Sequence, residues 1–431
     1  MTPDARLSAA IEILELIEAQ RRPAADALKE WGTGHRFAGS KDRAALAGLV
    51  YDALRVRASA VWLMGETTAR AILLGALRQA RGMDAQAIAA ACTGQGHAPA
   101  PLSEHESERL AKADPLADAP EHVRGEYPEW LAPDFAAAFG ERAVEEWRAL
   151  AQRAPLDLRV NTLKMTRDKA MAALAHLSPQ VTPFSPWGLR IEVGADSRGP
   201  ALSAEPAYVK GRVEVQDEGS QLAALLTGAQ PGWQVLDLCA GGGGKTLALA
   251  AMMENRGQIY ATDSDGRRLA ASFERLERAG VRNVQIRAPR GEQEVVDDLE
   301  SRCDLVLVDA PCTGTGAWRR NPDAKWRTRP GALEQRIAQQ DRALTRAARF
   351  VKPGGALVYV TCSVLRAENE DRVVAFMAAR PEFLPLDAGH LARRAGLPGL
   401  ADQASRFGAG LRLSPLTTRT DGFYIASLLR S

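Results

Sequence analysis

The stretch VLDLCAGGGGKT, residues 235–246, decides the fold of this 431-residue chain. Its apolar first half is typical of a buried parallel strand, and its glycines are typical of a tight turn. A helical pattern follows at once, so the stretch opens a βαβ unit. The sequence therefore predicts a doubly wound α/β domain, with a ligand bound beyond the carboxyl end of this strand.

The same alternation of strands and helices continues to the end of the chain. Further strands are predicted at QIYAT (258–262), NVQIR (283–287), DLVLV (304–308) and GALVYVT (355–361). Helices are predicted between and after them, at 246–255, 265–279, 331–350 and 367–379. LRLSPL (411–416) and GFYIASLL (422–429) are expected to pair as an antiparallel hairpin on the sheet edge. Residues 216–431 should thus form one Rossmann-like domain.

The N-terminal part has a different pattern. Residues 1–92 show no strand alternation, and two apolar stripes predict an all-α domain in which Ser40 caps a helix. The stripes consist of Leu7, Ile11, Leu14 and Ile17, and of Leu46, Leu49, Val50, Ala53 and Leu54. A Pro-rich linker is expected at 93–120 and a small mixed α+β subdomain at 121–215. In that subdomain, LRVNTLK (158–164) and LRIEV (189–193) read as strands around a helix at 167–176.

Composition narrows the possible functions. No apolar run of membrane-spanning length and no signal-peptide pattern occurs, so a cytoplasmic protein without a membrane partner is expected. The five cysteines include no CxxC or CxxH spacing, which argues against a disulfide framework and against a metal site. The net charge is only +2, but residues 311–350 hold 9 basic and 3 acidic side chains, a balance of 9 − 3 = +6. That stretch is either a polyanion site or a solvated helix face.

The loop after the first strand is the candidate cofactor site. A glycine-rich turn at a helix N-terminus brings backbone N–H groups close to a ligand, and Asp263, after the second strand, could accept both hydroxyls of a ribose. A P-loop would need a glycine where Cys239 stands, so a nucleotide hydrolase is disfavoured, whereas a nicotinamide site is left open. The candidate cofactor-binding residues are Cys239, Ala240, Gly241, Gly242, Gly243, Gly244, Lys245, Asp263 and Asp309.

Two cysteines follow neighbouring strands at this same edge. Cys312 lies in DAPCTGTG (309–316), and Cys362 ends the fifth strand. Methylation at carbon 5 of a pyrimidine needs a thiolate that adds to carbon 6, because carbon 5 is otherwise a poor nucleophile. A second thiol could then help elimination, Asp309 could bind the ring, and Lys245 could favour the thiolate. An inert buried thiol is the alternative for each cysteine.

The chain resembles the Sun/RsmB-type RNA (cytosine-5)-methyltransferases at these residues. The matching segments are LRVNTLK (158–164), VQDEGSQLAALL (215–226), VLDLCAGGGGKT (235–246), DLVLVDAPCTGTG (304–316), RRNPDAKWR (319–327), GALVYVTCSVLRAENE (355–370) and TDGFYIA (420–426). The resemblance implies a class I methyltransferase sheet and S-adenosylmethionine as cofactor. It also implies that Cys362 is the nucleophile, Cys312 assists product release, and Asp263 holds the cofactor ribose.

The resemblance also implies a substrate, and this chain differs from the family at two places. AGSKDRAALAGLVYDALR (38–55) is similar to a NusB-like helical domain, which implies ribosomal RNA, most directly 16S, with transfer RNA as an alternative. The family usually has Ala-Pro where this chain has Gly241 and Gly242. Arg287 or Ala288 stands where the family often has an acid near the adenine, so the adenine contact is unassigned.

Cationic side chains near the cysteines are the candidate RNA contacts. They are Arg319, Arg320, Lys325 and Arg327, with Arg329 beside them and Arg159 in the small subdomain. Trp318 and Trp326 could stack an unpaired base, or they could be core residues. A monomer is expected. The competing hypotheses are a non-catalytic ribosome-assembly factor and a methyltransferase acting on DNA or protein.

Overall fold

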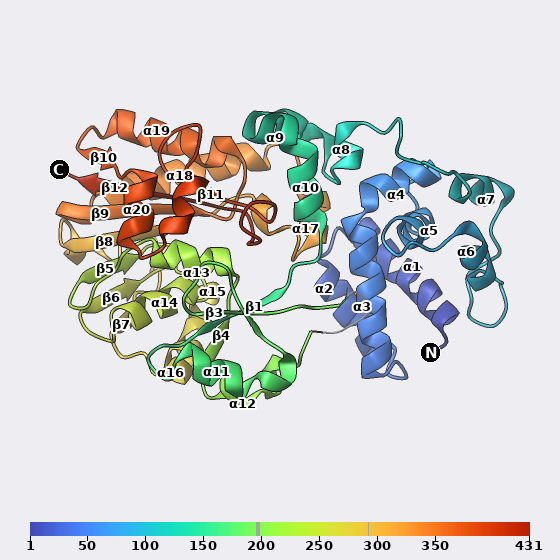
Figure 1. Cartoon of the computed structure of the whole chain (residues 1–431), viewed down its shortest axis with the longest axis horizontal. Coiled ribbons are helices and arrows are strands. Elements are labelled where there is room, and N and C mark those ends of the chain that lie inside the picture. Colours follow the sequence, from blue (N-terminus) through green and yellow to red (C-terminus); the bar gives the residue numbers. More distant parts are fainter. Residues whose placement is uncertain (195–198, 292) are drawn as a thin grey trace. The chain divides into compact units, whose positions relative to one another are not determined.

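The computed structural model describes residues 1–194, 199–291 and 293–431, and the chain forms two compact units (Figure 1). The helical unit comprises residues 1–154 and 318–330, with a short segment after Glu192. The sheet unit comprises residues 155–192, 200–317 and 331–431. Each unit has its own core and is described by itself.

Three helices form the centre of the helical unit: α1 (Pro3–Gln20), α3 (Ser40–Arg55) and α5 (Ala69–Gln79). Both predicted stripes face this core, although Ile11 is only half-buried. The predicted cap is wrong by one residue, because Gly39 is the N-cap of α3 and its N–H donates to the Asp42 carboxylate. The remaining helices are α2 (Ala24–Gly34), α4 (Arg57–Met64), α6 (Ala85–Ala91), α7 (Glu104–Leu110), α8 (Glu121–Arg124), α9 (Ala132–Phe139), α10 (Ala143–Ala151) and α17 (Pro322–Arg327).

Two of these helices bear on the expected domain boundaries. α7 lies in the segment expected to be a linker, and its Leu110 is buried in the core of the helical unit. α17, from the second half of the sequence, packs against α3 in the same unit. The boundaries at residues 92, 120 and 215 and the NusB-like character of the N-terminal part stay predictions. Within the described residues no single helix is long and apolar enough to span a membrane, and only α4 and α5 taken together, with a 105° bend, pass that test.

The sheet unit contains a small antiparallel sheet with the order β2-β3-β1-β4. Its strands are β1 (Leu156–Val160), β2 (Gln180–Val181), β3 (Gly188–Ile191) and β4 (Val213–Val215), with α11 (Arg167–Ala173) and α12 (Pro206–Val209) between them. β1, β3 and α11 match the predicted elements. β2 and β4 escaped prediction because two or three residues are too few to show a period.

The large sheet confirms the Rossmann-like prediction. Its order is β10-β12-β9-β8-β5-β6-β7, and the five strands from β5 to β9 are parallel. Their bounds are β5 (Gln234–Asp237), β6 (Gln258–Ala261), β7 (Val284–Ile286), β8 (Cys303–Asp309) and β9 (Val351–Thr361). The helices between and around them are α13 (Glu218–Leu225), α14 (Gly244–Met252), α15 (Gly266–Ala270), α16 (Ser272–Ala279), α18 (Ala332–Ala348), α19 (Glu370–Ala379) and α20 (Ala388–Arg394).

The C-terminal hairpin forms, but not at the sheet edge. β11 (Leu411–Leu413) pairs antiparallel with β12 (Phe423–Arg430), as expected. β12 itself lies between β9 and the short strand β10 (Phe383–Pro385), which was not predicted. The apolar character of GFYIASLL fits this interior position, since a strand flanked on both sides is buried on both faces. β12 thereby fixes the end of β9, where Cys362 follows.

Two buried carboxylates, Asp157 and Glu218, join the small sheet to helix α13. The Arg190 guanidinium donates to both carboxylate oxygens of Asp157, at 2.7 and 2.8 Å. The same Asp157 carboxylate accepts from the backbone N–H of Glu218 at the start of α13. The Glu218 carboxylate in turn accepts from the backbone N–H groups of Phe184 and Ser185. The VQDEGSQ segment therefore serves as the junction between the two sheets.

Candidate active site

The two cysteines singled out by sequence meet at the carboxyl ends of neighbouring strands. β8 and β9 run parallel in register, with Asp309 opposite Val360, and each is followed by a cysteine-bearing loop. The Sγ atoms of Cys312 and Cys362 are 3.4 Å apart. The backbone N–H of Gly316 donates to the Cys362 carbonyl at 2.9 Å, which ties the two loops together. Fifty residues of sequence thus separate two sulfurs that are in contact.

Cys312 is held as a neutral thiol. Its contact with Cys362, then burial, then the charges on Cys362 and Glu368 raise its pKa well above the ordinary value. A thiol that keeps its proton at neutral pH can donate to the neighbouring sulfur or to a departing thiolate. Cys312 therefore suits the role of a proton donor in the site, where it is half-buried like Cys362.

Lys245 and Asp309 form an ion pair beside the sulfurs. The Nζ of Lys245 lies 2.7 Å from Oδ2 of Asp309, and the Lys245 side chain is 8% exposed against 31% for Asp309. Burial alone would lower the pKa of Lys245, but the Asp309 carboxylate outweighs it and the net pKa is raised. The ammonium also lies 5.4 Å from the centre of the Phe423 ring. A permanent cation therefore accompanies the two thiols.

The glycine loop forms the tight turn that its sequence predicts. Gly241 and Gly243 have φ of +54° and +79°, which side-chain-bearing residues rarely adopt. A Cβ on Gly243 would also lie 2.9 Å from the Cβ of Ser272. The Gly242 carbonyl accepts from Arg275, whose side chain crosses the loop. α14 begins at Gly244, so its first N–H groups are available near the loop.

Asp263 organises this loop directly. One carboxylate oxygen accepts from the N–H of Gly241 and the other from the N–H of Asp265, both at 2.8 Å. The side chain is buried at the carboxyl end of β6. A turn of this shape, with an acid at the next strand end, fits a nucleoside ligand such as S-adenosylmethionine. At Cys239, which precedes the glycines, burial raises the pKa of the thiol above the normal range, so this thiol stays protonated.

Three of the residues predicted to contact RNA are buried. Lys325 is buried, and its ammonium donates to the carbonyls of Arg55 and Glu126 at 2.9 and 2.8 Å. These buried contacts keep the ammonium away from an RNA phosphate. Arg159 is 2% exposed and donates to Gln216, and Arg319 is also buried. Arg327 pairs with Asp323 but remains partly exposed. The prediction of RNA contacts by Lys325, Arg159 and Arg319 is therefore wrong, because these cations lie inside the fold.

The two tryptophans of this segment are structural. Trp318 is buried, 5.7 Å from Trp147 between ring centroids. The indole N–H of Trp326 donates to the Leu54 carbonyl at 2.6 Å, and the ring packs against the core of the helical unit. Both rings therefore serve the helical core, which was the alternative to base stacking.

Sequence reasoning assigned no role to Glu368, Asn369 or Gln340. All three side chains are buried in the sheet unit, next to the cysteine-bearing loops. The sequence feature that could have pointed to Glu368 and Asn369 is the ENE triplet (368–370), which ends the segment around Cys362. Nothing in the sequence distinguished them from a helix start on the surface.

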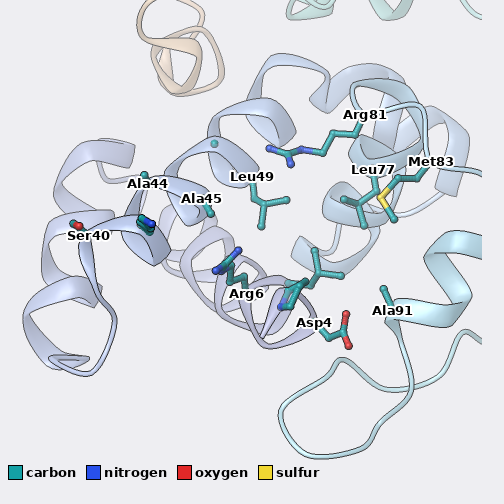
Figure 2. Close-up of a pocket in the computed structure, with 14 residues that line it drawn as sticks. Asp4, Arg6, Ser40, Ala44, Ala45, Leu49, Leu77, Arg81, Met83 and Ala91 are labelled. Atoms are coloured by element: carbon teal, nitrogen blue, oxygen red, sulfur yellow. The ribbon is translucent and has the colours of Figure 1, made fainter. Parts of the chain in front are cut away.

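A hollow of about 750 Å³ lies in the helical unit and holds none of the predicted site residues. Figure 2 shows Leu49 and Leu77 in its lining, together with Arg6 and Arg81. Both arginines are paired, Arg6 with Asp42 and Arg81 with Asp52. The hollow therefore offers no group of reactive side chains comparable to the cysteine pair.

Comparison with known proteins agrees with this geometry. Residues 224–429 match the family described as 16S rRNA methyltransferase RsmB/F, and residues 127–197 match its ferredoxin-like domain. Ribosomal RNA small subunit methyltransferase B of Sodalis glossinidius is 33% identical over 320 residues, which cover 73% of this chain and 68% of that protein. A probable enzyme of the same name from Synechocystis is 35% identical over 254 residues, 58% of this chain and 56% of the relative.

Solved structures show the same architecture. The structure of PH0851 covers 99% of both chains with a TM-score of 0.74 at 24% identity, which shows the fold alone. A methyltransferase homologue from Pyrococcus horikoshii has a TM-score of 0.57 at 26% identity, over 72% of this chain and 98% of its own. The likeness thus extends over the sheet and helical units alike.

Proposed function

Because the chain belongs to the RsmB/F family of S-adenosylmethionine-dependent 16S rRNA methyltransferases, we propose that it methylates carbon 5 of a cytosine in RNA, most directly 16S ribosomal RNA. The observation that carries the proposal is the 3.4 Å separation of the Cys312 and Cys362 sulfurs. Two thiols in contact at one sheet edge suit a reaction in which one sulfur bonds to carbon and the other serves its departure. A cytoplasmic, monomeric enzyme is part of the proposal.

The first step uses the Cys362 thiolate. It adds to carbon 6 of the cytosine, which makes carbon 5 nucleophilic enough to take a methyl group. Asp309, with 31% of its side chain exposed, accepts a hydrogen bond from the ring amino group or from protonated N3. The cation of Lys245 favours the negative charge that the site must hold before and during attack. S-adenosylmethionine, held by the glycine loop and Asp263, supplies the methyl group.

The second step restores the aromatic ring. A base removes the carbon-5 proton, the electron pair reforms the carbon 5–carbon 6 double bond, and the carbon 6–sulfur bond breaks. The leaving Cys362 thiolate is then stabilised by the neutral Cys312 thiol beside it, which donates a hydrogen bond or its proton. The raised pKa of Cys312 suits a donor and disfavours it as the attacking group.

Covalent trapping tests this assignment. We expect Cys312→Ala to accumulate a protein–RNA adduct with undermethylated ribosomal RNA and the methyl donor, visible on denaturing gels, and Cys362→Ala to form none. Cys303→Ala, which changes a buried thiol inside β8, serves as the matched control and should behave as the parent protein. An adduct in Cys362→Ala, or none in Cys312→Ala, contradicts the proposed roles.

Bisulfite sequencing of RNA tests the substrate. RNA from cells lacking this protein should lose one 5-methylcytosine in small-subunit ribosomal RNA. Loss of a transfer RNA mark instead would move the proposal to that substrate, and unchanged RNA would exclude cytosine methylation. Calorimetry of the full chain with S-adenosylmethionine distinguishes an enzyme from a non-catalytic ribosome-assembly factor. No heat of binding at millimolar cofactor would favour the assembly factor.

A further inference from the structure

The segment after Cys362 places two buried polar residues next to both cysteine loops. Glu368 is fully buried, and its Oε1 accepts from the backbone N–H of Thr313 at 2.8 Å. Its Oε2 accepts from the Thr313 hydroxyl at 2.5 Å. A buried carboxylate is costly unless it is fully hydrogen-bonded, so these contacts fix both Glu368 and the residue that follows Cys312.

Gln340 of α18 extends this hold to the other side of Cys312. Its Nε2 donates to Oε1 of Glu368 and to the carbonyl of Pro311, both at 3.0 Å. Cys312 is therefore bracketed, with Pro311 held by Gln340 and Thr313 held by Glu368. The Tyr359 hydroxyl donates to the Glu368 carbonyl at 2.6 Å and fixes the main chain of the bracket to β9.

Asn369 does the same for Cys362. Its Oδ1 accepts from the Thr361 hydroxyl at 2.5 Å, and its Nδ2 donates to the Ser363 carbonyl at 2.9 Å. These are the residues immediately before and after Cys362. Asn369 is also buried, so little water competes for these hydrogen bonds. Asn369 thus brackets Cys362, as Glu368 together with Gln340 brackets Cys312.

We propose that Glu368 and Asn369 are paired positioning residues, which hold the Cys312 and Cys362 loops so that the two sulfurs stay apposed. The proposal rests on the proposed function for its consequence in catalysis: loss of the Glu368 bracket should slow release, and loss of the Asn369 bracket should slow attack. Neither side chain reaches a sulfur by a hydrogen bond, so each acts through the main chain beside its cysteine.

Disulfide formation measures the apposition without using methyl transfer. One cysteine attacks oxidised glutathione and releases a glutathione thiolate, and the second cysteine displaces the other glutathione to close the Cys312–Cys362 bond. We expect this closure to be about tenfold slower in Glu368→Ala and in Asn369→Ala, because a small misplacement of reacting atoms is costly. Peptide mapping by mass spectrometry of the full chain follows the loss of two hydrogens.

Two further variants separate positioning from general damage. Glu368→Gln keeps an oxygen toward the Thr313 N–H and Gln340, and should recover most of the closure rate. Gln221→Ala removes a buried amide that bonds Ser185 and Gln216, and should close as fast as the parent protein. Equal closure rates in Glu368→Ala, Asn369→Ala and the parent, or an equal slowing in Gln221→Ala, would overturn the positioning roles.

The adduct assay tests the catalytic consequence, because the two variants should affect different steps. Glu368→Ala should accumulate the RNA adduct, which the parent releases, with an unchanged KM for RNA. Asn369→Ala, combined with Cys312→Ala so that the adduct persists, should form it more slowly than Cys312→Ala alone. If Cys312→Ala forms no adduct with any RNA, the proposed function fails, while the closure rates still decide the positioning roles. If Cys312→Ala forms the adduct, but Glu368→Ala releases it as the parent does and Asn369→Ala does not slow its formation, the positioning roles are wrong and the function stands.

Discussion

Two buried lysines, Lys245 in the sheet unit and Lys325 in the helical unit, have pKa values shifted in opposite directions. Lys245 contacts the Asp309 carboxylate directly, and its pKa is raised although it is buried. Lys325 donates to two backbone carbonyls, and burial lowers its pKa to about 7 despite the attraction of Glu126. A direct carboxylate contact thus raises the pKa of a buried lysine, whereas burial without such a contact lowers it.

The difference extends to the regions around the two lysines. The Lys245 region holds its reactive groups partly exposed, with Asp309 and both cysteines reachable from solvent. The segment around Lys325 buries Lys325 and Trp318, and its half-buried Trp326 packs against the helical core. Similar residue types thus serve chemistry in one region and packing in the other. The two regions should therefore respond differently to substitution.

The largest effect is expected from Lys245→Met. It removes the cation beside the thiols and Asp309, so methyl transfer should fall by about 10²–10³-fold, the usual cost of losing one preorganised charge at a reacting centre. Thermal stability should change little, because Asp309 is 31% exposed and water can solvate it. Steady-state transfer of labelled methyl groups and calorimetric melting check both parts. Near-parental activity would remove Lys245 from the proposed site.

Lys325→Met should show the reverse pattern. It leaves the carbonyls of Arg55 and Glu126 without their donor and the buried Glu126 carboxyl without its cation. Breaking such a buried arrangement costs about 3 kcal/mol of unfolding free energy. Urea unfolding followed by tryptophan fluorescence measures it. A loss below about 0.5 kcal/mol, the range of surface substitutions, would contradict the structural role.

A buried acid in the site region predicts a pH dependence. Burial raises the pKa of Asp237 to about 7, with Thr246 donating to it and the Asp309 charge adding to the rise. Since the folded state keeps this proton and the unfolded state does not, the unfolding free energy falls as pH rises from about 4 through about 7, then levels off.

The variant Asp237→Asn isolates this contribution. It should reduce the fall in unfolding free energy between pH 5 and 8 by about 2 kcal/mol, less than the full shift would give because the site relaxes. Glu126, whose pKa burial also raises to about 7, leaves a residual slope of the same sign. Urea unfolding at both pH values measures the change, and an unaltered slope would show that Asp237 is ionised throughout.

The smallest effect is expected from Arg329→Gln, four residues from Lys325 and exposed. Stability should change by less than about 0.5 kcal/mol, because an exposed side chain loses little on truncation. If Arg329 contacts a phosphate, the slope of log affinity for single-stranded RNA against log salt should become shallower by about 0.7. Filter binding at several salt concentrations detects this. An unchanged slope would leave the basic segment without an RNA role at this position.

The sequence alone determined where the parallel strands lie along the chain and which residues follow their carboxyl ends. Apolar runs, a glycine turn and the PC and TCS segments place Cys312, Cys362, Lys245, Asp263 and Asp309 at one sheet edge. This succeeds because parallel strands in a doubly wound sheet align their carboxyl ends, so local patterns translate directly into spatial neighbourhood.

Only the tertiary structure decided which polar residues are buried and what they touch. Lys325 and Trp318 looked like an RNA surface because charge and aromatic content do not report exposure. Glu368 and Asn369 looked like an ordinary helix start, yet they bracket the two cysteines. Burial and hydrogen-bond partners depend on segments far apart in the chain, here α18 with the Cys312 loop and α17 with α3, and no local pattern encodes those meetings.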